Sequence, residues 1–424
     1  MAKGKEKKIR ANTYGMRVMR ELFFCRIIRK QLLLDGENDY EYTYKRKRLK
    51  SFVKDGYVGE VVMLRHTYCY MTEKGYRHLI ASDNKYSVPA EIYYRNHKFF
   101  QSKFDDQVRV GETVFCLSRS DDEFSVLPDT RPSFSKFVEG EVVAKQQPWQ
   151  MTEDGRPIDF DLDKHITDGV FFPASEVRDV AKQIGKQDFM MMARFTGIMI
   201  INRQVFVLYN MMHRMLRWYE SCEFSTLSVI KEILMSYAPQ HRLRLQEINA
   251  ICLGQRLEDV KNMVWGRSTE RPTKENEVRI RNLSSQVLWA GNTNLYRKLY
   301  YVPIGRGNML KELERTWNDI LNDNATESEL KHAFDARGWL QLNEDGERRE
   351  GTDGNGHDIY RVTSLDIMKL NYMLGLDEFV LITFQDYVPV MKKMFGKQLV
   401  AIFCVEESEE GIPDFTNIHC IEVE

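Results

Sequence analysis

The segment Tyr44-Lys-Arg-Lys-Arg-Leu-Lys-Ser-Phe-Val-Lys-Asp-Gly decides how the N-terminal part of the chain folds. Leu49, Phe52 and Val53 recur at the three- and four-residue spacing of an amphipathic helix, so we expect them to face inward. Asp55-Gly56 supplies a turn that ends this helix. The segment therefore predicts a helix with an apolar inner face and a cationic outer face. The cations expected to face outward are Lys45, Arg46, Lys47, Arg48 and Lys50, with Lys54 one turn further on.

Further elements are expected on both sides of this basic helix. Before it, apolar residues at helical spacing predict a helix over 13–24, with Thr13 as its N-cap, and a second helix over 25–34. After it, β-rich runs over 57–65 and 67–71 predict two strands joined around Arg65-His66. Thr72 is the natural N-cap of a helix over 72–80. The expected order is helix, helix, basic helix, strand, turn, strand, helix.

This order resembles a winged helix-turn-helix domain. The run Arg48-Leu-Lys-Ser-Phe-Val-Lys-Asp-Gly-Tyr-Val, followed by Cys69-Tyr-Met-Thr-Glu-Lys-Gly-Tyr-Arg-His-Leu, is similar to the passage from the recognition helix to the last helix of MarR- and PadR-type domains. The resemblance implies a basic helix in the major groove of DNA and a wing near the minor groove or the phosphates. The DNA-binding residues that it implies are Lys45, Arg46, Lys47, Arg48, Lys50, Lys54, Arg65 and His66. Some winged helices contact only proteins, and that alternative stays open.

Charge is divided unevenly along the chain. The 424 residues have a net charge of −1, yet residues 1–80 hold 19 Lys and Arg against 9 Asp and Glu. The first 80 residues therefore carry about +10 and the rest of the chain about −11. A basic module on an acidic body is typical of a protein that binds a polyanion with one end. We expect the acidic part to form a homodimer or to bind a partner protein.

The length suggests two or three domains, at roughly 150 residues per domain. We expect a basic tail over 1–11, the winged-helix domain over 12–85, a helical linker region over 86–134, and an α/β domain over 135–424 with an exposed loop over 343–358. The expected helices of the last domain lie over 224–237, 243–254, 293–299 and 308–322. Its expected strands include a hairpin over 195–209 and the ranges 286–289, 379–384, 399–405 and 419–423. This alternation predicts a mixed α/β (α+β) fold.

A winged helix in front of a large acidic α/β body also resembles the architecture of replication-relaxation proteins of conjugative plasmids and integrative elements. That resemblance implies a cytoplasmic bacterial protein of a mobile element, acting in replication, conjugation or transcription control. Its partner would be double-stranded DNA, and no cofactor is expected.

Several other classes of protein are disfavoured. Seven scattered cysteines without a Cys-x-x-Cys pair argue against a zinc ribbon or a disulfide framework. No apolar run approaches the roughly 18 residues of a membrane-spanning helix. The sequence has no P-loop and no His-x-His pair, so neither a catalytic residue nor a metal site is predicted. The competing hypothesis is a nuclease or relaxase that the winged helix targets, with Asp168, Glu220 and Glu223 as its carboxylates, although no acid-x-Lys lies on the candidate strands.

Overall fold

The computed structural model of the chain has a mixed α/β fold, as the sequence predicts. It describes residues 14–35, 39–63, 65–82, 86, 104–120, 124–139, 150–152, 156, 158–190, 194–212, 215–305, 309–321, 324–341, 349–407 and 412–421. The expected tail over 1–11 and the expected N-cap Thr13 lie outside the described residues.

The chain divides into two compact units. Unit 1 comprises the described residues within 1–184, 196–201 and 236–241, and unit 2 comprises those within 185–195, 202–235 and 242–424. The boundaries predicted at residues 85 and 134 do not coincide with this division.

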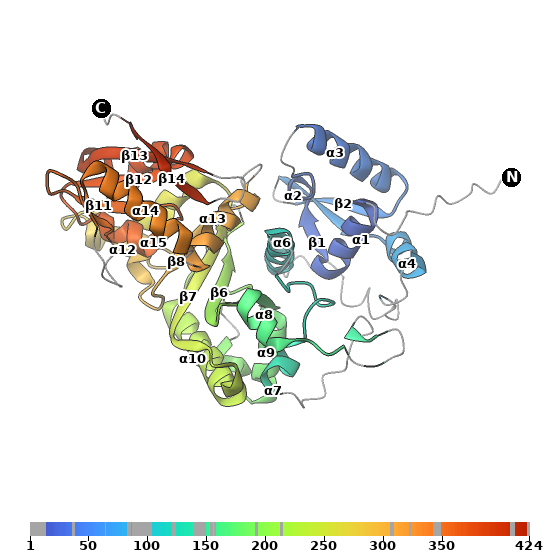
Figure 1. Ribbon diagram of the computed structural model, residues 1–424. Coiled ribbons are helices and arrows are strands. Elements are labelled where there is room, and N and C mark those ends of the chain that lie inside the picture. Colours follow the sequence, from blue (N-terminus) through green and yellow to red (C-terminus); the bar gives the residue numbers. More distant parts are fainter. Residues whose placement is uncertain are drawn as a thin grey trace. The chain divides into compact units, whose positions relative to one another are not determined.

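Unit 1 begins with helices around a three-stranded antiparallel sheet, coloured blue in Figure 1. In chain order the elements are α1 (Tyr14–Cys25), β1 (Ile27–Arg29), α2 (Lys30–Leu33), α3 (Asp39–Lys54), β2 (Val58–Met63), β3 (His66–Met71) and α4 (Glu73–Ser82). β3 lies between β1 and β2. The prediction of one helix over 25–34 is only partly correct: Ile27 and Ile28 are buried β-branched residues that pair with β3, and only α2 is helical.

α6 (Phe104–Ser120) packs against β1 and α1. Gly111 allows this close approach, because a side chain there would clash with the backbone oxygens of Cys25 and Ile27. The neighbouring Glu112 accepts hydrogen bonds of 2.5 and 2.6 Å from the guanidinium of Arg29, and both side chains are buried. The region predicted as a linker over 86–134 therefore contains a helix that belongs to the N-terminal core. We call the described residues within 14–120 the N-terminal module.

The rest of unit 1 contains a short antiparallel strand pair covered by helices. Its elements are α7 (Phe134–Glu139), α8 (Leu162–Asp168), β4 (Val170–Pro173), α9 (Ala174–Gln183) and β5 (Gly197–Ile201), with β4 paired to β5. Arg131, which is fully buried, donates two hydrogen bonds of 3.0 and 2.7 Å to Glu176 of α9. His241 returns to this unit and lies 2.9 Å from the carbonyl oxygen of Phe137.

Unit 2 contains two sets of parallel strands. The first set comprises β6 (Gln204–Asn210), β7 (Arg244–Gly254) and β8 (Leu299–Pro303), which run parallel in that order. The helices in this part of the chain are α10 (Glu220–Tyr237), α11 (Val260–Trp265), α12 (Glu277–Ser284) and α13 (Met309–Leu321).

The second set of strands, orange to red in Figure 1, forms a six-stranded sheet in the order β14-β13-β12-β11-β10-β9. Its strands are β9 (Leu340–Gln341), β10 (Gly351–Thr352), β11 (Asp358–Val362), β12 (Phe379–Phe384), β13 (Leu399–Glu407) and β14 (Pro413–Ile421). α14 (Asn324–Arg337) packs on β14 and β9, and α15 (Ile367–Met373) and α16 (Val388–Phe395) lie between β11, β12 and β13 in chain order. The central strands β11, β12 and β13 are parallel, whereas the outer pairs are antiparallel. The strands predicted over 379–384 and 399–405 are thus confirmed.

Other predictions for this part of the chain are wrong. Residues 243–254, predicted as a helix, form most of β7, and residues 293–299, also predicted as a helix, are a turn region that leads into β8. The strand predicted over 286–289 is reduced to one isolated bridge between Val287 and Arg217. Within the predicted 343–358 loop, residues 349–358 are described, and they include β10, which pairs with β11.

Among the described residues, no helix is long and apolar enough to cross a membrane.

Candidate nucleic-acid interface

α3 is longer than the sequence predicts, because it begins at Asp39 instead of near Tyr44. Asp39 and Glu41 stand in its first turn, where carboxylates stabilise the partial positive charge of a helix N-terminus. Leu49 is fully buried and Phe52 nearly so, and these residues hold the inner face of the helix against the module. The outer face of α3 is the side of the helix opposite Leu49 and Phe52.

Four cations occupy one stripe on that outer face. At about 100° per residue, positions 46, 47, 50 and 54 fall within roughly one quadrant of the helix, on the side away from Leu49 and Phe52. All four side chains are exposed, and none forms an ion pair with a residue that the structure describes. We call Arg46, Lys47, Lys50 and Lys54 the α3 stripe. An exposed row of unpaired cations on one helix face can bind a row of phosphates or the acceptor atoms of bases.

Lys45 does not belong to this stripe, and the prediction that it faces outward is wrong. The residue is 8% exposed, and its side chain pairs with Glu41 at 2.5 Å and donates a 2.5 Å hydrogen bond to the carbonyl oxygen of Asp35. Lys45 thus joins the start of α3 to the chain that follows α2. Its positive charge is paired with a carboxylate of the same helix.

Arg48 is exposed, as predicted, but it lies on a different side of α3 from the stripe. Its Nε atom is 3.4 Å from the hydroxyl of Tyr44, and its guanidinium lies over that ring at 5.6 Å from the centroid. Arg48 therefore has an aromatic partner one turn earlier on its own helix.

The predicted wing is a tight turn between β2 and β3. Met63 pairs with His66, and Arg65 in the turn has a φ of +68° and an exposed side chain. His66 is the first residue of β3, is half-buried, and lies edge-on to the ring of Tyr68. Of the two predicted wing residues, Arg65 is thus the one at the tip.

The C-terminal end of α3 is clamped to α4. The single hydroxyl hydrogen of Thr72 is shared between the carbonyl oxygens of Gly56 (2.6 Å) and Tyr57 (3.0 Å), and the hydroxyl oxygen accepts the N–H of Gly75 at 3.1 Å. Thr72 is therefore the N-cap of α4, as predicted. Lys74 donates a hydrogen bond of 2.8 Å to the carbonyl oxygen of Asp55, so its ammonium group makes a contact within the module. These contacts join the turn that follows α3 to the first turn of α4.

Two exposed residues on the side of the stripe were missed by sequence reasoning. Thr43 lies three residues before Arg46, and Tyr40, which is 83% exposed, lies three residues before Thr43. Both fall in the extra N-terminal turns of α3. Asp39 at the start of this run was the available signal, since acidic residues favour the first turn of a helix.

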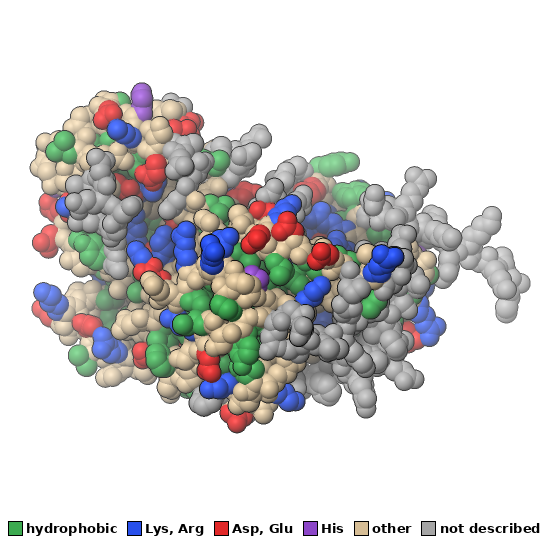
Figure 2. Space-filling model, turned by 60° about the horizontal axis from the view of Figure 1, so that its bottom comes forward, with side chains coloured by type: hydrophobic (Ala, Val, Ile, Leu, Met, Phe, Trp, Pro, Cys, Tyr) green, Lys and Arg blue, Asp and Glu red, His purple; other side chains and the backbone are tan. Residues whose placement is uncertain are grey.

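Charged side chains of both signs occur on one face of the molecule. On the face of the molecule drawn in Figure 2, acidic and basic side chains are interspersed with apolar ones. The four cations of the α3 stripe have no carboxylate partner within the described part of the chain and lie together on one helix face.

The carboxylates considered for a nuclease have other surroundings. Glu223 is buried, accepts the hydroxyl of Tyr209 at 2.9 Å and accepts the backbone N–H of Arg194 at 2.9 Å. Glu220 is an exposed residue in the first turn of α10, and Asp168 is half-buried at the end of α8. Within the described ranges, no three His, Cys, Asp or Glu residues are placed to hold a metal ion.

Comparison with known proteins gives no relative for this chain: no protein-family model, no curated protein and no solved structure matches it.

Proposed function

We propose that the N-terminal module is a winged helix that binds double-stranded DNA. The observation that carries the proposal is the α3 stripe, four exposed cations opposite the buried face of one helix. The order α1, α2, α3, β2, β3, α4 supports it, because it matches the order helix, helix, basic helix, strand, turn, strand, helix of the family that the sequence resembles, with β1 as an added strand.

In this proposal α3 enters the major groove and the turn at Arg65 approaches the neighbouring phosphates. Thr43, Lys47 and Lys50 are the side chains best placed for base edges, because they lie on the outer face of the helix in its N-terminal and middle turns. Arg46 and Lys54 flank them and are assigned to phosphates. Lys45, Arg48 and His66 are left out of the contact set.

The wider role is proposed from the architecture alone. A basic module joined to an acidic body fits a DNA-binding protein of a bacterial mobile element, in which the acidic part forms a homodimer or recruits a protein partner. Dimers of helix-turn-helix proteins bind two half-sites, which gives a reason for a dimer here.

The test measures binding of the intact chain to a duplex by fluorescence anisotropy at two salt concentrations. Replacing Lys47 and Lys50 together by alanine should weaken binding at least tenfold at low salt. Replacing Arg46 and Lys54, the two cations assigned to phosphates, should lower the slope of log affinity against log salt by about 2, since each phosphate contact contributes roughly 0.9.

The matched control also removes two cations from the same module. Arg48→Ala with Arg77→Ala should leave affinity within about threefold of wild type, because Arg48 lies off the stripe and Arg77 is paired with Glu73. Equal losses in the two double variants would indicate diffuse attraction and would sink the assignment of α3. Absence of binding in all proteins would favour a module that contacts only proteins.

The same samples, supplied with magnesium, test the enzyme alternative. We expect intact duplex after prolonged incubation. Strand cleavage that disappears in Asp168→Ala or Glu220→Ala would replace the proposal by a nuclease.

A further inference from the structure

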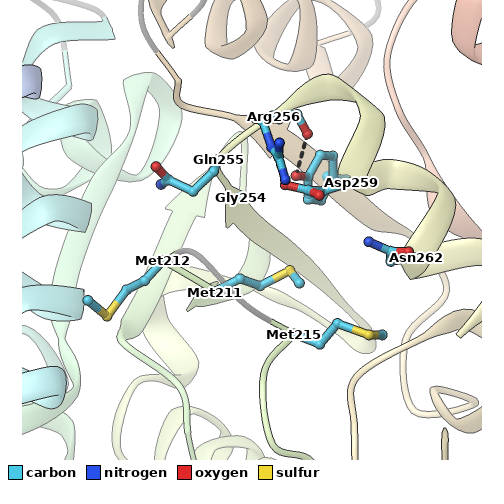
Figure 3. Close-up of a pocket in the computed structure, with 9 residues that line it drawn as sticks. Met211, Met212, Met215, Gly254, Gln255, Arg256, Asp259 and Asn262 are labelled. Atoms are coloured by element: carbon cyan, nitrogen blue, oxygen red, sulfur yellow. Dashed lines mark hydrogen bonds and ion pairs between the residues drawn. The ribbon is translucent and has the colours of Figure 1, made fainter. Parts of the chain in front are cut away.

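A cavity of about 230 Å³ lies within unit 2, at the carboxyl ends of the parallel strands β6 and β7 (Figure 3). Met211 and Met212 follow β6, Gly254 ends β7, and Tyr301 comes from β8. In sheets with parallel strands, the loops beyond the carboxyl ends are where ligands bind. The location alone therefore marks this cavity as a candidate ligand site, separate from α3.

The backbone around the cavity is held in a demanding conformation. Met212 has a φ of +57°, which a side chain other than glycine adopts only at some cost in energy. Asn210, fully buried, stabilises that conformation by accepting the N–H of Met212 at 2.8 Å. Such strained residues collect at binding and active sites, because the surrounding fold must keep them in place.

The floor of the cavity is closely packed. The ring of Tyr301 lies directly against the backbone of Gly254, where any side chain would clash with it. The Tyr301 hydroxyl donates to the carbonyl oxygen of Arg256 at 2.8 Å, and Ile304 N–H donates to the carbonyl oxygen of Gly254 at 2.8 Å. The cavity is thus built on a rigid base.

Its two sides differ in chemistry. Figure 3 shows Met211, Met212 and Met215 along one side, while the polar residues lie along the other. The polar residues are Gln255, Arg256, Asp259 and Asn262. Thioethers favour the faces and edges of aromatic rings, whereas amides and a carboxylate bind ring nitrogens and exocyclic amino or carbonyl groups.

The charges on the polar side argue against a small ion as the ligand. Arg256 and Asp259 lie 3.6 Å apart and largely neutralise each other, so neither a phosphate nor a metal ion would meet a strong field. The volume is below the roughly 300–1,000 Å³ of pockets for drug-sized ligands, so the ligand must be compact. A flat ring with a hydrogen-bonding edge matches the lining best.

We propose that this cavity binds a single nucleobase, presented by a free nucleoside. The base enters with its ring toward the methionine side, and its polar edge meets Asn262, Asp259 and Gln255. The sugar points toward solvent past the exposed Arg256.

The test uses the full chain with its methionine methyl groups labelled with ¹³C, and adenosine and cytidine as probes. One of the two nucleosides should shift the methyl signals of Met211, Met212 and Met215, because an aromatic ring changes the magnetic field at nearby protons. Each signal is assigned by its loss in a Met→Leu variant. Asn262→Leu and Asp259→Asn should each weaken binding at least tenfold, and Glu258→Gln, an exposed neighbour that does not line the cavity, should not.

Benzyl alcohol serves as a flat ring without a base-like polar edge, and it should cause no comparable shifts. The proposal fails if neither nucleoside moves these three signals up to about 10 mM. It also fails if benzyl alcohol binds as well as the nucleosides, or if both polar variants keep wild-type affinity. The methyl signals of the wild-type chain report on the cavity directly. The test therefore does not depend on a variant that fails to fold. Duplex affinity is unaffected by the cavity variants, which separates this result from the role of α3.

Discussion

Glu312 is a buried carboxylate on α13 that shares one guanidinium with two other acids. Arg315 donates to Glu312 at 2.9 Å and makes bidentate contacts with Glu407 and Asp386, while the hydroxyl of Tyr387 donates to the second oxygen of Glu312. Burial raises the pKa of Glu312 from 4.5 to about 7, although Arg315 and Tyr387 oppose the shift. In the folded chain Glu312 therefore keeps its proton to a higher pH than in the unfolded chain.

The sign of the resulting pH dependence follows from proton binding. Between pH 4.5 and about 7 the folded state holds more protons than the unfolded state, so this group's contribution to stability is complete at low pH and is lost as the pH rises. Glu312→Gln cannot titrate, so the difference in unfolding free energy between wild type and variant should shrink or change sign across this window. Urea denaturation from pH 4.5 to 8 measures it. The exposed Glu275→Gln is the control, and a constant difference for Glu312→Gln across all pH values would contradict the assignment.

Lys45 marks the limit of what the sequence predicts about single residues. The cationic run and the inward positions of Leu49 and Phe52 could be predicted from spacing, and both are present. That Lys45 faces inward could not be predicted, because its partner, the carbonyl oxygen of Asp35, is brought near by the packing of α2 and α3. Arg48 was similarly assigned to DNA by its charge, whereas its position beside Tyr44 depends on the helix phase.

At the scale of elements, the contact of α6 with β1 depends on the absence of one side chain. Gly111→Ala would place a methyl group against the carbonyl oxygens of Cys25 and Ile27, and neither can move without displacing α1 or β1. We expect a loss of about 1–3 kcal/mol in the unfolding free energy, despite the better helix propensity of alanine. Chemical denaturation measured by fluorescence would show it.

The matched substitution for this prediction is Gly354→Ala, where the added methyl group meets open space. Its unfolding free energy should stay within about 0.5 kcal/mol of wild type. A Gly111→Ala protein as stable as the control would mean that α6 does not press on β1.

The elements with one buried face were predicted from the sequence, whereas a strand buried on both faces was not. α3 and the hairpin β2–β3 have one buried face, so their periodicity was visible in the sequence. β7 was mistaken for a helix because its C-terminal half is buried on both faces and its sequence does not alternate. β1 was hidden inside an expected helix, since three residues are too few to display a period.

At the scale of the molecule, the N-terminal module should require α6. A fragment of residues 1–130 retains α6 and Asp129, which accepts hydrogen bonds of 2.9 and 3.0 Å from Arg20. A fragment of residues 1–85 leaves β1 uncovered and Arg29 buried without Glu112, and an ionic partner lost in this way costs about 3–5 kcal/mol.

We therefore expect cooperative thermal unfolding, followed by circular dichroism, for residues 1–130 and a broad transition without cooperativity for residues 1–85. If the proposed function is correct, the longer fragment also keeps most of the duplex affinity of the intact chain. A cooperative transition at the same temperature in both fragments would make α6 dispensable and restore the boundary expected near residue 85.

The interleaving of the two units has a consequence for synthesis on the ribosome. Unit 1 takes its last segments from 196–201 and 236–241, so it stays incomplete until His241, whose ring stacks on Phe137, has emerged. At roughly 5–20 residues per second, that is on the order of 5 to 20 seconds after residue 130 has been translated. During that interval Phe137 keeps its contacts with Phe134 and Phe172 but lacks the ring of His241. A message truncated before this point would yield a chain with a complete N-terminal module and an unfinished unit 1.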